Sequence, residues 1–333
     1  DHWEPLIEML CYLTAQEFRK PTESETVGLY ESPPRDFRLL PLLAMSEPSV
    51  FFGEGGAGKT ELMALLCCLI ANGGLLGSLV AVQGPVMYID YETDRDTFNR
   101  RLRRLARGLN IPYPSIEYYR GGLPFARDIA SIKANVLNKR IDYVFIDSAS
   151  LAVGGQLENT EAVGQFFSAI RQLGIGSTIV THTAKNREVG SRTAFGSVYW
   201  TNLARSVWEV IGSQEEGSNQ LSMAIKHTKV NEQGKMPRIG LRFVFNEEQT
   251  MVSEHRISDL PGLESSMPTK QRMIDATMGL EGGAGTMAEI AEATGLSKAT
   301  VQKTIQRNPN TWVRLAGTNG VLSRYGVRNL DMA

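Results

Sequence analysis

The chain has 333 residues, 42% hydrophobic and 21% charged, which fits a soluble globular protein of one large domain or two ordinary ones. Its formal net charge of −1 excludes a global polycation, so any nucleic-acid site must be local. The three cysteines, Cys11, Cys67 and Cys68, lack C-x-x-C or Cys/His spacing, which argues against disulfides or zinc and favours reduced thiols in the cytoplasm. We expect no membrane partner, because glycines interrupt the uncharged run at residues 62–82.

The first predicted element is a helix over residues 1–20, because apolar residues recur at helical spacing from Trp3 to Leu13. A proline-punctuated segment follows, and we assign residues 1–45 to an N-terminal helix and lead-in. The helix either docks on a neighbouring subunit or simply caps the core. The chain starts at Asp1 without an initiator methionine, so we expect it to be a fragment of a longer protein.

Residues 53–60 read G-E-G-G-A-G-K-T and fill the pattern G-x-x-x-x-G-K-[ST], which cradles nucleoside triphosphates. A short apolar strand at 49–52 precedes this loop, and a helix at 59–72 follows with leucines at helical spacing. Lys59 is expected to reach the β- and γ-phosphates of ATP, and the Thr60 hydroxyl to bind Mg²⁺. The predicted nucleotide-binding residues are Gly53, Glu54, Gly55, Gly56, Ala57, Gly58, Lys59, Thr60 and Glu61.

Strands and helices alternate after this loop. We predict strands at 49–52, 86–91, 116–119, 143–147 and 178–183, with helices at 59–72, 95–107, 126–138 and 161–173. This rhythm predicts an α/β core over residues 46–255, with a mostly parallel central sheet covered on both faces. Three further strands, at 205–212, 221–230 and 239–245, are expected to extend the sheet antiparallel.

Two of the predicted strands end in carboxylates. Glu92 follows the strand M-Y-I-D-Y and is predicted to activate the attacking water, with Asp90 on the same strand face as the alternative. The apolar strand Y-V-F-I-D ends in Asp147, which is predicted to contact Mg²⁺ directly or through water. A solvated strand end is the other interpretation of Glu92.

The strand at 178–183 ends in T-H-T, and its His182 is predicted to sense the γ-phosphate and relay its presence to the next loop. A merely hydrogen-bonded histidine is the alternative. The loop at 185–199 offers Lys185, Arg187, Arg192 and Phe195. Basic groups bind phosphates and aromatic rings stack on bases, so this loop is a candidate single-stranded DNA site, although a solvated loop fits its composition equally well.

Three basic residues late in the core, Arg205, Lys226 and Lys229, are typical of charges delivered to a neighbouring subunit's γ-phosphate. The pattern leaves open which of them acts as such a finger.

Residues 256–268 form a Pro/Gly/Ser linker, and residues 269–333 carry eight Lys/Arg against five Asp/Glu. Three helices are predicted there, at 269–278, after Thr286 and after Ser297, followed by a hairpin around Asn319–Gly320. This arrangement predicts a winged helix-turn-helix domain. Its third helix would contact DNA through Lys298, Lys303 and Arg307, or the domain would dock a protein.

In this order, the motifs G-E-G-G-A-G-K-T, Y-I-D-Y-E, Y-V-F-I-D-S, T-H-T and G-S-V-Y-W-T-N-L-A-R-S-V-W resemble the RecA-like ATPases over residues 46–247, most closely the RepA-type hexameric helicases. The resemblance implies a six-membered ring, ATP between subunits and single-stranded DNA threaded through central loops. It also implies Glu92 as the catalytic base, Asp147 as the magnesium aspartate, His182 as the sensor and Arg205 as the residue acting across the interface.

Two departures from the family's pattern matter. The segment K-H-T-K at 226–229 lacks the Lys-x-Arg of many replicative helicases, and a winged C-terminal domain is not part of the core pattern. GTPases are a poor match, because Asp147 is followed by Ser-Ala-Ser instead of D-x-x-G, and the N-K-x-D pattern is missing.

We therefore predict an ATP-hydrolysing, hexameric single-stranded DNA translocase: a replicative helicase of phage or plasmid type, in the cytoplasm of a bacterial or phage-infected cell. Its expected partners are single-stranded DNA, other copies of itself, and a primase or loader. Two alternatives stay open. One is a RecA/RadA-like recombination or repair ATPase. The other is a DNA-binding regulator in which ATP only sets the assembly state and the winged helix reads a site.

Overall fold

The computed structural model describes residues 3–19, 36–183, 198–230, 234–263, 266–315 and 323–328. Contacts divide the chain into two units, residues 1–35 and 36–333. The first unit contains α1 (Glu4–Arg19), close to the helix predicted from the sequence. Its apolar side chains, including Trp3, Leu6 and Leu10, are exposed. The second unit begins at residue 36, ahead of the predicted start of the core at 46, and its strand β1 (Phe37–Leu40) pairs with β5 (Leu79–Ala81).

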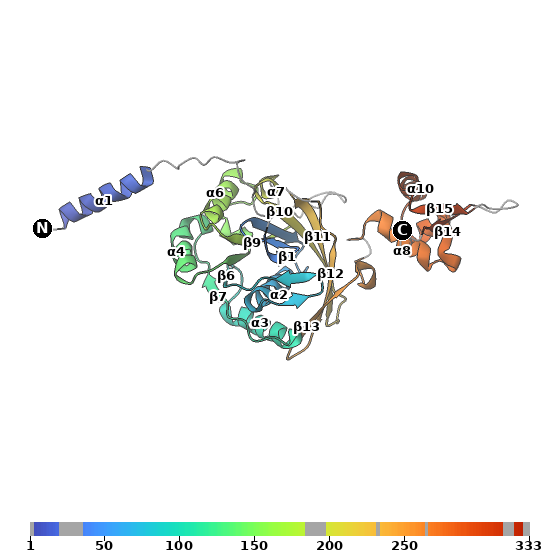
Figure 1. Cartoon of the computed structure of the whole chain (residues 1–333), viewed down its shortest axis with the longest axis horizontal. Helices are drawn as coiled ribbons and strands as arrows, with labels where there is room; N and C mark the ends of the chain where they lie inside the picture. The colour runs from blue at the N-terminus through green and yellow to red at the C-terminus, as the bar shows by residue number, and fades with distance from the viewer. Residues whose placement is uncertain are drawn as a thin grey trace. The chain divides into compact units, whose positions relative to one another are not determined.

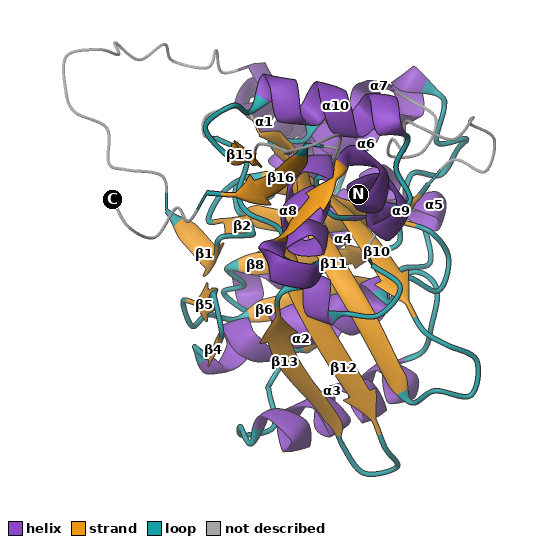
Figure 2. Ribbon diagram, turned by 90° about the vertical axis from the view of Figure 1, so that its right-hand side faces the viewer, coloured by secondary structure: helices purple, strands orange, loops and turns teal. Residues whose placement is uncertain are grey.

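The second unit is built on a large twisted sheet with the order β13-β12-β11-β10-β3-β9-β8-β6-β7 among the described residues (Figures 1 and 2). One half runs parallel: β3 (Pro48–Gly53), β6 (Val86–Asp90), β7 (Glu117–Arg120), β8 (Tyr143–Asp147), β9 (Gly176–His182) and β10 (Ser206–Ser213). The other half continues antiparallel through β11 (Gln220–Val230), β12 (Ile239–Phe245) and β13 (Thr250–His255). The predicted α/β core with a mostly parallel sheet is thereby confirmed.

Two details of the sheet differ from the sequence-based prediction. The first of the three late strands, β10, pairs parallel with β3, and only the later strands are antiparallel. The strand β13 was not predicted, because its sequence T-M-V-S-E-H is short and polar and is stabilised by pairing with β12.

Helices cover both faces of the sheet, as the alternation predicted. On one face, α2 (Lys59–Asn72) and α3 (Arg95–Leu109) pack in one hydrophobic cluster with Phe51, Tyr88 and Phe98. On the other, α4 (Phe125–Asn138) and α6 (Thr160–Arg171) pack around Phe125 and Phe166. The two short helices of this core are α5 (Ala149–Ala152) and α7 (Val198–Leu203).

A small four-stranded sheet accounts for the uncharged run at residues 62–82. Residues 62–70 of α2 are buried on all sides, which requires apolar residues all round the helix. The run then continues into two short strands of a sheet that the sequence did not predict: β2 (Leu43–Ala44), β1 (Phe37–Leu40), β5 (Leu79–Ala81) and β4 (Leu75–Leu76), in that order. In the described ranges, no helix is both long and apolar enough to cross a bilayer.

The C-terminal segment contains the predicted helices. They are α8 (Thr269–Gly279), α9 (Met287–Thr294) and α10 (Lys298–Arg307), and the short 3-10 helices are η1 (Ile257–Asp259) and η3 (Glu281–Gly283). The capping box of Thr286 and Glu289 is present. The strands β14 (Ala284–Thr286), β16 (Arg324–Val327) and β15 (Trp312–Leu315) form a small sheet.

The second hairpin strand therefore starts at Arg324, three residues beyond the predicted 321, and residues 316–322 lie outside the described part. Met273, Ile290, Val301 and Trp312 form the core of this segment. Three helices with a small sheet are the elements expected of a winged helix. The assignment of that domain type and its boundaries remains a prediction.

Candidate nucleotide-binding site

The P-loop connects the carboxyl end of β3 to the start of α2, at the edge of the parallel sheet. Two glycines are needed for its path. A Cβ at Gly53 would collide with the carbonyl oxygen of Val210 on β10, and Gly58 has a left-handed backbone with φ of 81° directly before the helix. The loop residues Glu54–Gly56 are exposed, so the N–H groups at the helix start are open to an anion.

Lys59 is buried at this helix start, and its ammonium is held by the loop itself. Its Nζ donates to the carbonyl oxygens of Gly53 at 2.9 Å and Glu54 at 2.7 Å, and lies 3.4 Å from Nδ1 of His182. Burial lowers the pKa of Lys59, and the charges of Asp147 and Glu92 oppose that shift. The ammonium therefore lies at the P-loop, where it would contact the phosphates of a nucleotide, and it contacts two carbonyl oxygens of the loop.

Thr60 and Asp147 meet beside Lys59. The Thr60 hydroxyl donates to Oδ2 of Asp147 at 2.9 Å, and the Tyr88 hydroxyl donates to the same oxygen at 2.6 Å. Asp147 is 3% exposed, and burial raises its pKa, because the charged form loses hydration there. A bound cation would offset that cost.

The pair of Thr60 and Asp147 fits Mg²⁺. A hydroxyl and a carboxylate are hard oxygen ligands, and Mg²⁺ in nucleotide sites commonly takes one or two protein oxygens together with phosphates and waters. Over the described ranges there is no cluster of three or more His, Cys, Asp or Glu side chains that would form an all-protein metal cage.

Glu92 lies between His182 and Ser148 at the neighbouring strand ends. Its Oε1 accepts a short hydrogen bond from the Ser148 hydroxyl and lies 3.7 Å from Nε2 of His182. These contacts, with that of His182 contributing most, lower the pKa of Glu92 to about 2. Lys59, His182 and Glu92 therefore form one connected group.

Asp90, the alternative to Glu92, is occupied by local structure. It is 1% exposed, and its Oδ1 accepts from the backbone N–H groups of Glu92 at 2.9 Å and Thr93 at 2.8 Å. Its Oδ2 accepts from the hydroxyls of Thr93 at 2.5 Å and Tyr118 at 3.0 Å. Both oxygens thus hold the turn that presents Glu92.

The three late basic residues differ in their surroundings. Lys226 pairs with the buried Glu209 at 2.7 Å. Lys229 donates to the carbonyl oxygens of Thr201 at 2.5 Å and Ala204 at 3.0 Å, so it binds the end of α7 in its own chain. Arg205, in contrast, is exposed.

Arg205 lies at the wrong end of the sheet for its own P-loop. Its N–H donates to Pro48 O at 3.1 Å, and the next residue pairs with Ser49 at the amino end of β3. The P-loop leaves the carboxyl end of β3 at Gly53, about 16 Å away at the rise of a parallel strand. An arginine side chain is too short to cover that distance.

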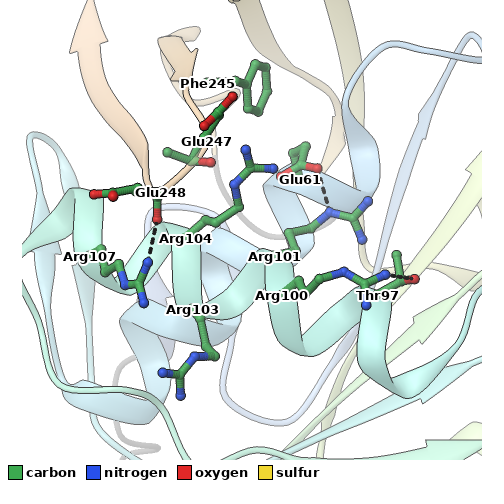
Figure 3. Close-up of a pocket in the computed structure, with 11 residues that line it drawn as sticks. Glu61, Thr97, Arg100, Arg101, Arg103, Arg104, Arg107, Phe245, Glu247 and Glu248 are labelled. Carbon is green, nitrogen blue, oxygen red and sulfur yellow. Dashed lines mark hydrogen bonds and ion pairs between the residues drawn. The ribbon is translucent and has the colours of Figure 1, made fainter.

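A pocket of about 540 Å³ lies beside the first turn of α2 (Figure 3). Glu61 on one side bonds to Arg101 of α3, and the turn between β12 and β13 closes the other side with Phe245 and Glu247. Figure 3 shows Arg104 pointing between Glu61 and this turn, with Arg103 pointing away from it. The lining residues are Glu61, Thr97, Arg100, Arg101, Arg103, Arg104, Arg107, Phe245, Glu247, Glu248 and Thr250.

Two buried donors of this pocket, Nη1 of Arg101 and Nε of Arg104, have no hydrogen-bond partner within the described residues. Buried donors without a partner are uncommon in folded proteins, so these two atoms mark the pocket wall as unusual. The sequence analysis missed this pocket, although six arginines within fifteen residues of α3 were a signal for it. Ser148 and Tyr88 were not predicted from the sequence either, because a serine after a strand and a tyrosine within one carry no specific signal.

The proposed DNA loop, with Lys185, Arg187, Arg192 and Phe195, lies outside the described residues. Lys298, Lys303 and Arg307 are exposed on α10.

A family model described as the AAA domain matches residues 15–188, which is just over half of the chain. Among solved structures, a KaiC-like protein from the hyperthermophilic archaeon Pyrococcus horikoshii OT3 aligns with a TM-score of 0.47 and 14% identity, covering 66% of this chain and 98% of that one. A search of curated proteins finds no match to the chain. On the family match, the chain belongs to the AAA-domain family of P-loop ATPases.

Proposed function

We propose that this protein hydrolyses ATP in sites shared between subunits of a ring and uses the energy to move along single-stranded DNA, as a replicative helicase. The observation that carries the shared site is the position of Arg205, exposed at the end of β3 opposite its own P-loop. An arginine there can complete only a neighbour's site, which favours a closed ring or a filament of identical subunits.

The roles within one site follow from the geometry. Lys59 exchanges the carbonyls of Gly53 and Glu54 for the β- and γ-phosphates. Thr60 and Asp147 hold Mg²⁺, which neutralises charge on the β- and γ-phosphate oxygens when bound. Glu92 orients the attacking water and accepts its proton. His182, in contact with both Lys59 and Glu92, registers whether a γ-phosphate is present.

The pocket beside α2 is our proposed place for the nucleoside of ATP. The α-phosphate of a P-loop nucleotide lies against the first turn of the helix, so the ribose and base continue past Glu61. The guanidinium of Arg104 and the ring of Phe245 line this pocket and would offer the nucleoside a hydrogen-bond donor and an apolar surface.

Replacing Arg104 by methionine should raise the KM for ATP by roughly tenfold with little change in kcat. The change removes a charged donor from binding that is common to substrate and transition state, while the side chain keeps its length. Steady-state ATPase kinetics measure this. Arg95→Met is the matched control, since Arg95 lies on the same helix but does not line the pocket. Equal effects of the two changes would refute the placement.

The proposed site for single-stranded DNA is the loop at residues 185–199. This assignment rests on the basic, glycine-containing sequence of the loop, which directly follows His182. A loop in that position would receive the state of the γ-phosphate from His182, and Lys185, Arg187 and Arg192 would contact the backbone of the strand.

The test of the whole proposal is the ATPase rate with and without single-stranded DNA, read beside the particle mass. We expect stimulation by single strands and a mass of about six subunits. Unwinding of forked DNA supports the helicase, whereas strand exchange by filaments replaces it with a recombination ATPase. Duplex-specific binding without turnover, lost on removing residues 269–333, would instead support a regulator that uses its C-terminal segment.

A further inference from the structure

Ser148 follows Asp147 at the end of β8 and occupies the position before α5, where a serine side chain normally caps the helix. Here the hydroxyl makes no capping hydrogen bond to α5. It donates instead to Oε1 of Glu92, on the neighbouring strand end. The start of α5 therefore lacks a side-chain cap, and the Ser148 hydroxyl bonds to a residue of the candidate site instead.

Ser150 completes a short chain of hydroxyls. The oxygens of Ser150 and Ser148 are 2.5 Å apart. Because a carboxylate only accepts, the proton of Ser148 is committed to Glu92, and Ser150 must donate to Ser148. Ser148 is fully buried and Ser150 is half-buried, so the rotamer of Ser148 is restricted by its surroundings. The chain holds one oxygen of Glu92 at a defined place.

Glu92 needs such support, because its side chain is 37% exposed and is linked to the strand by rotatable bonds. A general base acts efficiently only within hydrogen-bond reach of the water it deprotonates. Because Oε1 accepts from Ser148 and lies near His182, rotation of the carboxylate is limited.

We propose that Ser148 is a positioning residue for Glu92 and that Ser150 orients Ser148. This inference rests on the proposed role of Glu92 as the base. It gives the two serines of the S-A-S sequence after Asp147 a positioning role through Glu92.

The first test is Ser148→Ala. We expect kcat for ATP hydrolysis to fall by roughly 10- to 100-fold, the range for losing a hydrogen bond to a charged group, with KM and nucleotide affinity unchanged. Ser150→Ala should show the same pattern with a smaller loss. Ser177→Ala is the matched control, since Ser177 is a fully buried serine on the adjacent β9 whose hydroxyl has no hydrogen-bond partner in the described structure.

The pH profile and a rescue separate positioning from packing. A donor stabilises the charged carboxylate, so losing Ser148 should raise the pKa of Glu92, and the acid limb of kcat should move to higher pH. Ser148→Thr keeps the hydroxyl and should restore most of kcat. If Ser148→Ala does not fold, as judged by thermal unfolding, Ser150→Ala carries the same test.

A double-mutant cycle distinguishes this inference from the proposed function. In a Glu92→Gln background, Ser148→Ala should cost no further activity, because its effect acts through Glu92. Additive losses, or a normal kcat in both serine variants while Glu92→Gln is inactive, would overturn the role of Ser148 and leave Glu92 as the base. Normal turnover in Glu92→Gln would overturn the proposed base itself.

Discussion

Replacing Glu92 by glutamine should lower kcat for ATP hydrolysis by about 10²- to 10⁴-fold, the usual contribution of a general base, while ATP still binds. Glutamine keeps the shape of the side chain and still accepts from Ser148, but it cannot take a proton from water. Single-turnover ATPase assays and equilibrium nucleotide binding measure the two quantities separately.

Asp90→Asn is the control for this assignment. Asp90 accepts four hydrogen bonds in the turn before α3. Its replacement should therefore lower the melting temperature of the protein, while kcat falls far less than in Glu92→Gln. If Asp90→Asn abolishes turnover in a well-folded protein and Glu92→Gln does not, the base is Asp90.

Arg205→Ala should leave ATP binding intact and lower turnover by about 10³-fold or more, as for the loss of an arginine finger. Lys59→Ala should abolish turnover by removing the charge on the β- and γ-phosphates. The two inactive proteins, mixed before assembly, should regain activity. With equal amounts and random neighbours, about a quarter of the interfaces combine an intact Lys59 with an intact Arg205.

Rescue fails if Arg205 serves its own subunit, because each protein would then lack a complete site. Lys229→Ala is the comparison, since this lysine binds carbonyls at the end of α7 and its loss should lower stability without rescue by mixing. Absence of activity at every mixing ratio would show that Arg205 does not act on a neighbouring subunit. The proposal of a site shared between subunits would then lose its main support.

The central part of the fold was predictable because local patterns specified it. The G-E-G-G-A-G-K-T loop, its flanking strand and the buried leucines of α2 agree with one another, and α2 has the predicted bounds. The small sheet was not predictable in this way. Its strands have two to four residues and pair Leu39 and Leu40 with Ala81 and Val80, far apart in the sequence. Only tertiary packing stabilises such short segments.

Within the candidate site, too, the sequence pattern predicted only part of the arrangement. Spacing placed Asp90 and Glu92 on one strand face and left both as candidate bases. What separates them is the turn that uses both oxygens of Asp90, which no local pattern reveals. The position of Arg205 opposite the P-loop likewise depends on the parallel pairing of β10 with β3.

The contacts of Lys59 have a consequence for how tightly the protein retains its substrate. The carbonyls of Gly53 and Glu54 compete with phosphate oxygens for the same ammonium, so the empty loop has an internal competitor. The apparent affinity for a nucleotide is the intrinsic affinity scaled by the fraction of molecules in which the ammonium is released. Nucleotide binding therefore includes the cost of releasing the Lys59 ammonium from both carbonyls.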